Sequence, residues 1–150
     1  MKCLLQRVTQ ASVTVADEVV GEIDQGLLVL VGVEPKDAEQ TVTRMAERLL
    51  RYRVFPDAEG KMNLNVAQVQ GSILLVSQFT LAADTTSGNR PGFSTAAPSE
   101  QASNLCNQLA DALRKGDVRV EAGRFGADMQ VALVNDGPVT MMLDSNDRKG

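Results

Sequence analysis

The amino-acid sequence predicts an α+β fold in which a curled, barrel-like β-sheet packs against two main helices. Three observations predict it: β-type patterns occupy residues 2–33, two amphipathic helical patterns lie in the middle, and β-type patterns return in the last third. The chain has 150 residues, with no internal repeat and no linker. We therefore expect a single domain over residues 1–150, with a frayed, charged tail at 144–150.

The N-terminal third is expected to supply the centre of the sheet. In residues 8–15 apolar side chains fall among polar ones, and Asp24-Gln25-Gly26 is typical of a turn. Residues 26–33 are apolar throughout. Such a run predicts a central strand that is buried on both faces.

A first helix is expected at about 38–51. Its apolar residues recur at the i, i+3, i+4, i+7 spacing of one buried helix face; they are Val42, Met45, Ala46, Leu49 and Leu50. Asp37 is the expected N-cap, with Gln40 as its capping-box partner. Three arginines share the outer region of this helix: Arg44, Arg48 and Arg51. They form either a solvated face paired with Glu47 or a phosphate contact.

The rest of the chain completes the sheet around a second helix. The patterns predict, in order, a short strand at 52–55, a turn at 56–60, a buried strand at 73–78 and a long polar loop at 83–98. The second helix should begin with Ser99 as N-cap and end at Gly116. Strands at 118–122, 127–134 and 139–143 follow. Residues 135–138 then form either a hairpin turn or a Gly-Pro unit, where a cis peptide bond costs little.

The composition excludes several kinds of chemistry. The sequence contains no histidine, which rules out Ser-His-Asp and Cys-His catalysis. Its two cysteines, Cys3 and Cys106, are expected to be free thiols, and so few ligands argue against a zinc site. The net charge of −4 argues against gripping long nucleic acids, but it does not exclude recognition of a single-stranded RNA end. No apolar run is long enough to span a membrane, and the N-terminus meets charge too soon for a signal peptide.

Polar residues end the buried strand at 73–78. Ser77, Gln78 and Thr80 follow four branched apolar residues, with Phe79 among them. A buried polar group needs a partner. The hydroxyls therefore either satisfy neighbouring backbone groups or line a site.

Seven segments together resemble the D-aminoacyl-tRNA deacylases over nearly the whole chain. They are residues 6–8, 26–33, 53–55, 76–81 with the motif Ser-Gln-Phe-Thr-Leu, 88–91, 125–129, and 135–140 with the motif Gly-Pro-Val-Thr. The resemblance implies a homodimeric, cytoplasmic hydrolase without metal or organic cofactor. Such an enzyme cleaves the ester between a D-amino acid, or glycine, and the terminal adenosine of tRNA, so the aminoacylated tRNA 3′ end is the implied partner.

The resemblance also implies roles for particular residues. The segment from Ser77 to Thr80 lines the site of the ester carbonyl, and Phe125 and Met129 shape the pocket for the adenosine. Gly137 and Pro138, joined by a cis bond, enter the site of the other subunit and reject L-amino acids. Apart from the resemblance, Arg7 is either a brace for the carbonyls of that segment or a surface cation.

The residues themselves suggest how an ester could be cleaved. Gln78 and the backbone N–H of Phe79 or Thr80 are candidate donors to the oxyanion, worth about 3–4 kcal/mol each. Thr80 has no histidine to activate it as a nucleophile. We therefore favour attack by water, assisted by the vicinal ribose hydroxyl, over an acyl-enzyme on Thr80. The alternatives are a non-catalytic module that binds nucleotide or RNA ends and, less favoured, a threonine amidase.

Overall fold

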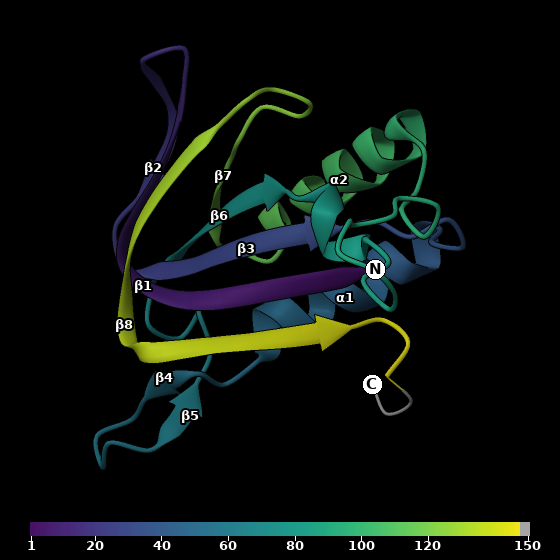
Figure 1. Ribbon diagram of the computed structural model, residues 1–150. Helices are drawn as coiled ribbons and strands as arrows, with labels where there is room; N and C mark the ends of the chain where they lie inside the picture. The colour runs from purple at the N-terminus through teal and green to yellow at the C-terminus, as the bar shows by residue number, and fades with distance from the viewer. Residues whose placement is uncertain (148–150) are drawn as a thin grey trace.

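The structure, a computed structural model, describes residues 1–147 and confirms the α+β fold (Figure 1). The main sheet contains β1 (Lys2–Val15), β2 (Glu18–Ile23), β3 (Gly26–Gly32), β6 (Ser72–Ser77), β7 (Arg119–Ala122) and β8 (Gln130–Asp144). The other elements are α1 (Glu39–Arg51), the short pair β4 (Phe55–Pro56) and β5 (Met62–Leu64), the 3-10 turn η1 (Phe79–Ala82) and α2 (Ser99–Arg114).

The long strand β1 organises the sheet. Its first half pairs with β3 and its second half with β2, while β8 runs antiparallel along almost all of it. Beyond β3 the sheet continues through β6 and β7 in parallel. Figure 1 shows β2 and the adjoining part of β8 rising away from the helices, so that the sheet curls over itself. This is the barrel-like shape that the sequence predicted.

The two faces of the sheet carry separate cores. On one face α1 and α2 pack side by side over β3 and β6, around large buried residues such as Leu27, Leu49, Ile73 and Leu109. Inside the curl, a smaller core is formed by Val8, Ala11, Val13, Ile23, Leu28, Leu74 and Val76. Burial on both faces explains why β3 and residues 73–76 of β6 are apolar. Neither helix of residues 1–147 is long and apolar enough to cross a membrane.

The expected helix caps were wrong by one residue. Ala38, in extended conformation, is the N-cap of α1, and its N–H donates to Thr41 Oγ1 over 3.1 Å. Asp37 is buried instead, because its carboxylate accepts hydrogen bonds of 2.7 Å from the N-terminal ammonium and from the N–H of Glu34. Pro98, not Ser99, is the N-cap of α2.

Of the two alternatives at 135–138, the structure has the Gly-Pro unit and not the hairpin turn. The two strands predicted on either side of it are one strand, β8, because both halves pair with β1. The extra residues are absorbed as a bulge: Gln6 faces Thr140, whereas Val8 faces Asn135. The predicted strand at 52–55 is reduced to Phe55–Pro56, which pairs with β5.

The C-terminal segment makes more contacts than a frayed tail would. The N–H of Ser145 donates to the carbonyl of Met1 over 2.8 Å, and Arg48 donates to the carbonyl of Asp144 over 3.3 Å. The rest of the predicted tail, 148–150, lies outside the described residues. Cys3 and Cys106 are free thiols, as expected.

Candidate active site

The end of β6 leads directly into a tight turn over β3. The N–H of Gln78 donates to the carbonyl of Val31 over 2.7 Å, and η1 then carries the chain across Gly32. A Cβ on Gly32 would lie 2.8 Å from the Cβ of Leu81. Only glycine allows the turn to pack this closely, so β3 fixes where the polar residues after β6 point.

The residues of this turn are arranged around the amide of Gln78. Its Nε2 donates a hydrogen bond to Thr80 Oγ1. The first N–H groups of a 3-10 turn have no acceptor within the turn, so those of Phe79 and Thr80 are open to a ligand. Phe79 is 57% exposed and packs against Phe93, with ring centroids 5.1 Å apart. Phe93 was not among the predicted site residues, although its position after two glycines in the polar loop at 83–98 was a signal for it.

A cavity of about 400 Å³ opens beside the turn. Its lining combines five of the predicted site residues, which are Ser77, Gln78, Phe79, Phe125 and Met129. A Cβ on Gly123 would lie 2.8 Å from Met129 Sδ, so this glycine makes room for the methionine. Thr80 does not line the cavity, but its hydroxyl is hydrogen-bonded to the amide of Gln78, which lines it. The start of α2, including Ser99 and Ala102, also lines it and was missed, because helix packing cannot be read from a capping pattern.

The cavity offers neutral hydrogen-bonding groups more than charged ones. The polar side chains at its β6 end are a hydroxyl and an amide, and Asp128 is the carboxylate in the lining.

Two groups outside the lining have shifted pKa values. In the nearby loop, hydrogen bonds from Thr86 lower the pKa of Asp84. Burial raises the pKa of the Cys106 thiol to about 11, which keeps it protonated at neutral pH. Among the described residues, no group of three or more Cys, Asp or Glu is placed to hold a metal ion.

Residues 136–138, here called the Gly-Pro segment, lie far from this cavity within one chain. Val8 pairs with Gly26 at the start of β3 and, on its other side, with the residue just before the Gly-Pro segment. Ser77 pairs with Val31 at the other end of β3. Five strand residues span roughly 16 Å. The structure therefore separates the predicted site residues into two groups.

The Gly-Pro segment is exposed but held firmly by two side chains. Arg7 is only 9% exposed and donates from Nε to the carbonyl of Asp136 over 3.0 Å and from Nη1 to the carbonyl of Val54 over 2.6 Å. It is therefore a brace and not a surface cation. Asn135 accepts from the N–H of Val139 over 2.8 Å and donates back to its carbonyl over 3.2 Å.

Glycine is required at position 137 for two reasons. Its φ is +129°, a conformation that L side chains rarely adopt, and an added Cβ would lie 2.7 Å from Arg7 Nη2. The Gly137–Pro138 peptide bond is cis, as the resemblance implied.

Comparison with known proteins connects this arrangement to a family. A protein named D-aminoacyl-tRNA deacylase from Teredinibacter turnerae is 57% identical over 145 residues, covering 97% of this chain and 100% of the relative. A protein of the same name from Xanthomonas oryzae pv. oryzae is 62% identical over 144 residues, covering 95% and 99%.

Two solved structures share the fold. One, described as a c-Myc DNA unwinding element binding protein, has a TM-score of 0.90 at 42% identity and covers 96% of this chain and 98% of its own. The other, a probable eukaryotic D-amino acid tRNA deacylase, has a TM-score of 0.84 at 16% identity, covering 95% and 97%. The family model of the D-Tyr-tRNA(Tyr) deacylases matches residues 4–144. With these relatives at high identity over nearly its full length, the chain belongs to the D-Tyr-tRNA(Tyr) deacylase family.

Proposed function

We propose that this protein is a D-aminoacyl-tRNA deacylase, which hydrolyses the ester between a D-amino acid and the 3′-terminal adenosine of tRNA. The observation that carries the proposal is the full-length match to proteins of that name at 57–62% identity. The cavity beside η1 supports it, because it combines neutral donors with aromatic and thioether side chains. As aminoacyl-tRNA is used in translation, the protein acts in the cytoplasm.

The ester carbonyl is proposed to lie against the turn at Gln78. Its amide and the N–H groups of Phe79 and Thr80 then face the oxygen on which negative charge develops. Such donors stabilise the transition state more than the ground state, by about 3–4 kcal/mol for one donor. An aminoacyl ester is already reactive, so these donors and a well-placed water are sufficient.

Thr80 is proposed to position Gln78 and not to attack the ester. Its hydroxyl oxygen accepts a hydrogen bond from the Gln78 amide, which fixes the direction of that amide. The sequence contains no histidine to deprotonate a threonine. Water is the nucleophile, and the neighbouring ribose hydroxyl of the substrate assists the proton transfer.

The adenosine is proposed to occupy the part of the cavity lined by Phe125 and Met129. Phe125 is 39% exposed, so its ring is available to a base. Stacking on aromatic side chains is the usual way to hold an unpaired RNA base. The lining contains no cationic side chain, which agrees with recognition of a short end by shape instead of by phosphate neutralisation.

We propose a homodimer in which the Gly-Pro segment of one subunit closes the cavity of the other. This segment is exposed, braced and distant from its own cavity. Next to Val76 at the cavity, Leu30, Leu4 and Met142 form an apolar row across adjacent strands, and Met142 is 43% exposed. A two-fold axis at this row would give two equivalent sites.

The Gly-Pro segment is proposed to select by exclusion. Main-chain atoms placed where an L side chain must project reject every L-amino acid, whatever its side chain. Glycine has no side chain to clash, so glycyl-tRNA is cleaved as well.

Nucleic-acid binding without catalysis is the second candidate. It is favoured by the description of one relative of known structure as a DNA unwinding element binding protein. Turnover separates the two candidates: purified protein with D-tyrosyl-tRNA, L-tyrosyl-tRNA and glycyl-tRNA should hydrolyse the first and third and spare the second. Binding of all three without hydrolysis would leave the binding module as the function.

The cross-subunit arrangement has its own test. Gln78→Ala damages the cavity and Gly137→Ala damages the Gly-Pro segment, so each variant alone should be inactive. Refolding the two together gives mixed dimers with one intact site, and roughly a quarter of the wild-type activity should return. If both residues served a site within one chain, no activity would return.

A further inference from the structure

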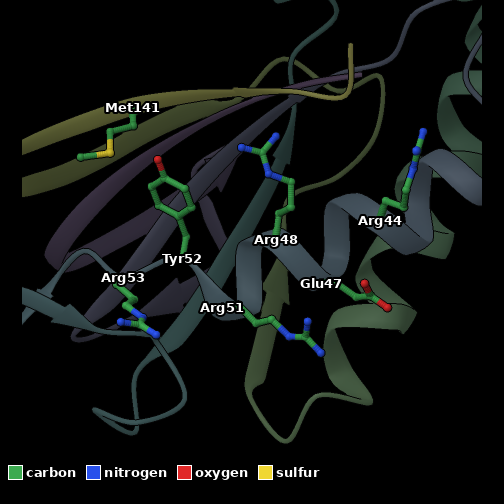
Figure 2. A pocket seen from close by; sticks show the side chains of 7 residues that line it. All are labelled: Arg44, Glu47, Arg48, Arg51, Tyr52, Arg53 and Met141. Atoms are coloured by element: carbon green, nitrogen blue, oxygen red, sulfur yellow. The ribbon is translucent and has the colours of Figure 1, made fainter. Parts of the chain in front are cut away.

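A second hollow, lined mainly by arginines, lies away from the cavity. It has a volume of about 700 Å³ and lies between the outer face of α1 and β8. We call it the arginine hollow; its lining includes Arg44, Arg48, Arg51, Arg53, Tyr52 and Met141. Figure 2 shows Arg48 and Tyr52 rising from the end of α1 towards the strand that carries Met141, with Arg51 and Arg53 pointing away from it.

The charge in this hollow is opposite to that of the whole chain. Four arginines and Glu47 line it, and Arg48 forms an ion pair with Asp147 over 3.5 Å. The sum is 4 − 2 = +2, whereas the chain has a net charge of −4. Glu47 does not neutralise its neighbours, since within residues 1–147 no ion pair joins it to Arg44 or Arg51. The face is solvated, as the sequence allowed, but within residues 1–147 the pairing of Arg44 or Arg51 with Glu47 does not form. Positive charge gathered over a wide hollow with an aromatic ring suits a chain of phosphates better than a single anion.

The arginine hollow adjoins the Gly-Pro segment. Arg53 precedes Val54, whose carbonyl accepts a hydrogen bond from Arg7, and Arg7 also holds the carbonyl of Asp136. On β8, Met141 follows Pro138 by three residues, or about 10 Å of strand. In the proposed dimer, the hollow of one subunit therefore lies beside the cavity of the other.

We infer that the arginine hollow binds the sugar-phosphate backbone of the tRNA whose 3′ end occupies the partner subunit's cavity. The inference builds on the proposed function and adds to it a second contact with the same RNA. The exposed guanidinium groups of Arg44 and Arg51 pair with phosphates. The hollow thus supplies affinity for the body of the tRNA, while the cavity, which has no cationic side chain in its lining, binds its 3′ end.

The test compares two charge-removing changes. Arg44→Gln with Arg51→Gln removes two exposed charges from the hollow. The matched control is Arg114→Gln, which removes an exposed arginine from the last turn of α2, as Arg51 is in the last turn of α1. The control matches Arg51→Gln in its change of one charge and in helix-dipole interaction, and its effect is therefore compared per arginine removed.

Direct binding of uncharged tRNA is the first measurement. The double variant should bind roughly tenfold more weakly at low salt, and the slope of log affinity against log salt should fall by about 1 per arginine. Arg114→Gln should change neither quantity. Unchanged affinity in the double variant, or an equal loss in the control, would overturn the inference, whether or not the protein is catalytic.

Hydrolysis of two substrates is the second measurement. With D-tyrosyl-tRNA the double variant should show a raised KM and an unchanged kcat, whereas with D-tyrosyl-adenosine, which has no RNA body, both constants should stay at wild-type values. An equal loss on both substrates would place the arginines in the support of the cavity and overturn the inference. A wild-type protein that cleaves neither substrate contradicts the proposed function, and the binding measurement then still decides the arginine hollow.

A last arm separates RNA from a small anion. Inorganic phosphate at millimolar concentration should raise the melting temperature of the wild-type and the double variant equally. If phosphate stabilises only the wild-type protein, and the double variant binds tRNA as tightly as the wild-type does, the hollow is a site for free anions and the inference is wrong.

Discussion

The turn after β6 follows the end of a strand, and the Gly-Pro segment forms a bulge within one. Different contacts hold the two regions. The turn is fixed by backbone: a hydrogen bond from Gln78 to Val31 and close packing over Gly32. The Gly-Pro segment is fixed by side chains, namely Arg7 and Asn135. Side-chain changes in the turn should therefore leave the protein stably folded and lower only its activity. Changes to the side chains that hold the Gly-Pro segment should alter the conformation of that segment.

The largest effect is expected from Arg7→Ala. Its loss leaves the carbonyl of Val54 buried without that donor, and the carbonyl of Asp136 loses its brace. A hydrogen bond from a charged group contributes about 1.5–3 kcal/mol, so unfolding in denaturant should show a loss of roughly 3 kcal/mol. Deacylation of D-tyrosyl-tRNA should fall as well, even under conditions where the variant is folded.

Arg119→Ala is the matched control, because Arg119 is an exposed arginine on β7 whose salt bridge to Glu121 is at the surface. Its stability should stay within about 0.5 kcal/mol of wild-type. If Arg7→Ala behaved like this control, Arg7 would not brace the Gly-Pro segment.

The contrast between the two regions also explains what the sequence could predict. The turn was found from the sequence because an apolar run followed by polar residues is a local pattern, and β3 and β6 were predicted almost to their ends. The brace at Arg7 was left open, because the arginine and Asp136 are 129 residues apart. The choice between a hairpin turn and a Gly-Pro unit at 135–138 could not be made from the local pattern for the same reason: pairing with β1 decides that β8 continues.

Family resemblance supplied what local patterns could not. It named Phe125, Met129 and Gly137 as site residues, and the first two do lie in one cavity with Ser77. The contribution of α2 to that cavity depends on how the helix packs against the sheet, which no pattern within the helix specifies. The roles of these residues in catalysis remain predictions.

Gln78→Ala should lower kcat strongly without unfolding the protein. Removing one oxyanion donor costs about 100- to 1,000-fold in kcat. Because the backbone holds the turn, the free energy of unfolding should change by less than about 0.5 kcal/mol. Gln40→Ala, on the exposed first turn of α1, is the control and should leave both quantities unchanged. An unaltered kcat in Gln78→Ala would transfer the oxyanion role to backbone N–H groups alone.

Gly137→Ala should disturb the Gly-Pro segment by pushing against Arg7. The methyl group would lie 2.7 Å from Arg7 Nη2 at a φ of +129°, and such strain costs about 1–3 kcal/mol. Gly60→Ala is the control, since Gly60 also has a positive φ but no atom within 4 Å of an added Cβ. Both variants should lose some stability, but only Gly137→Ala should lose deacylation of D-tyrosyl-tRNA. Equal activity in the two variants would separate the segment from catalysis.

The smallest effect is expected from Thr80→Ala, and it tests how far the turn depends on backbone alone. If Thr80 only orients the Gln78 amide, its loss removes one hydrogen bond, worth roughly 1 kcal/mol or about fivefold in kcat. The substrate comparison is D-tyrosyl-tRNA with a terminal adenosine whose free ribose hydroxyl is replaced by hydrogen. That replacement should cost wild-type more than Thr80→Ala does, because the hydroxyl assists the attacking water directly. Acid quench followed by mass spectrometry should find no tyrosyl group on wild-type protein. A tyrosyl ester on Thr80 in that experiment, together with complete inactivity of Thr80→Ala, would make the threonine the nucleophile and the turn a site of covalent chemistry.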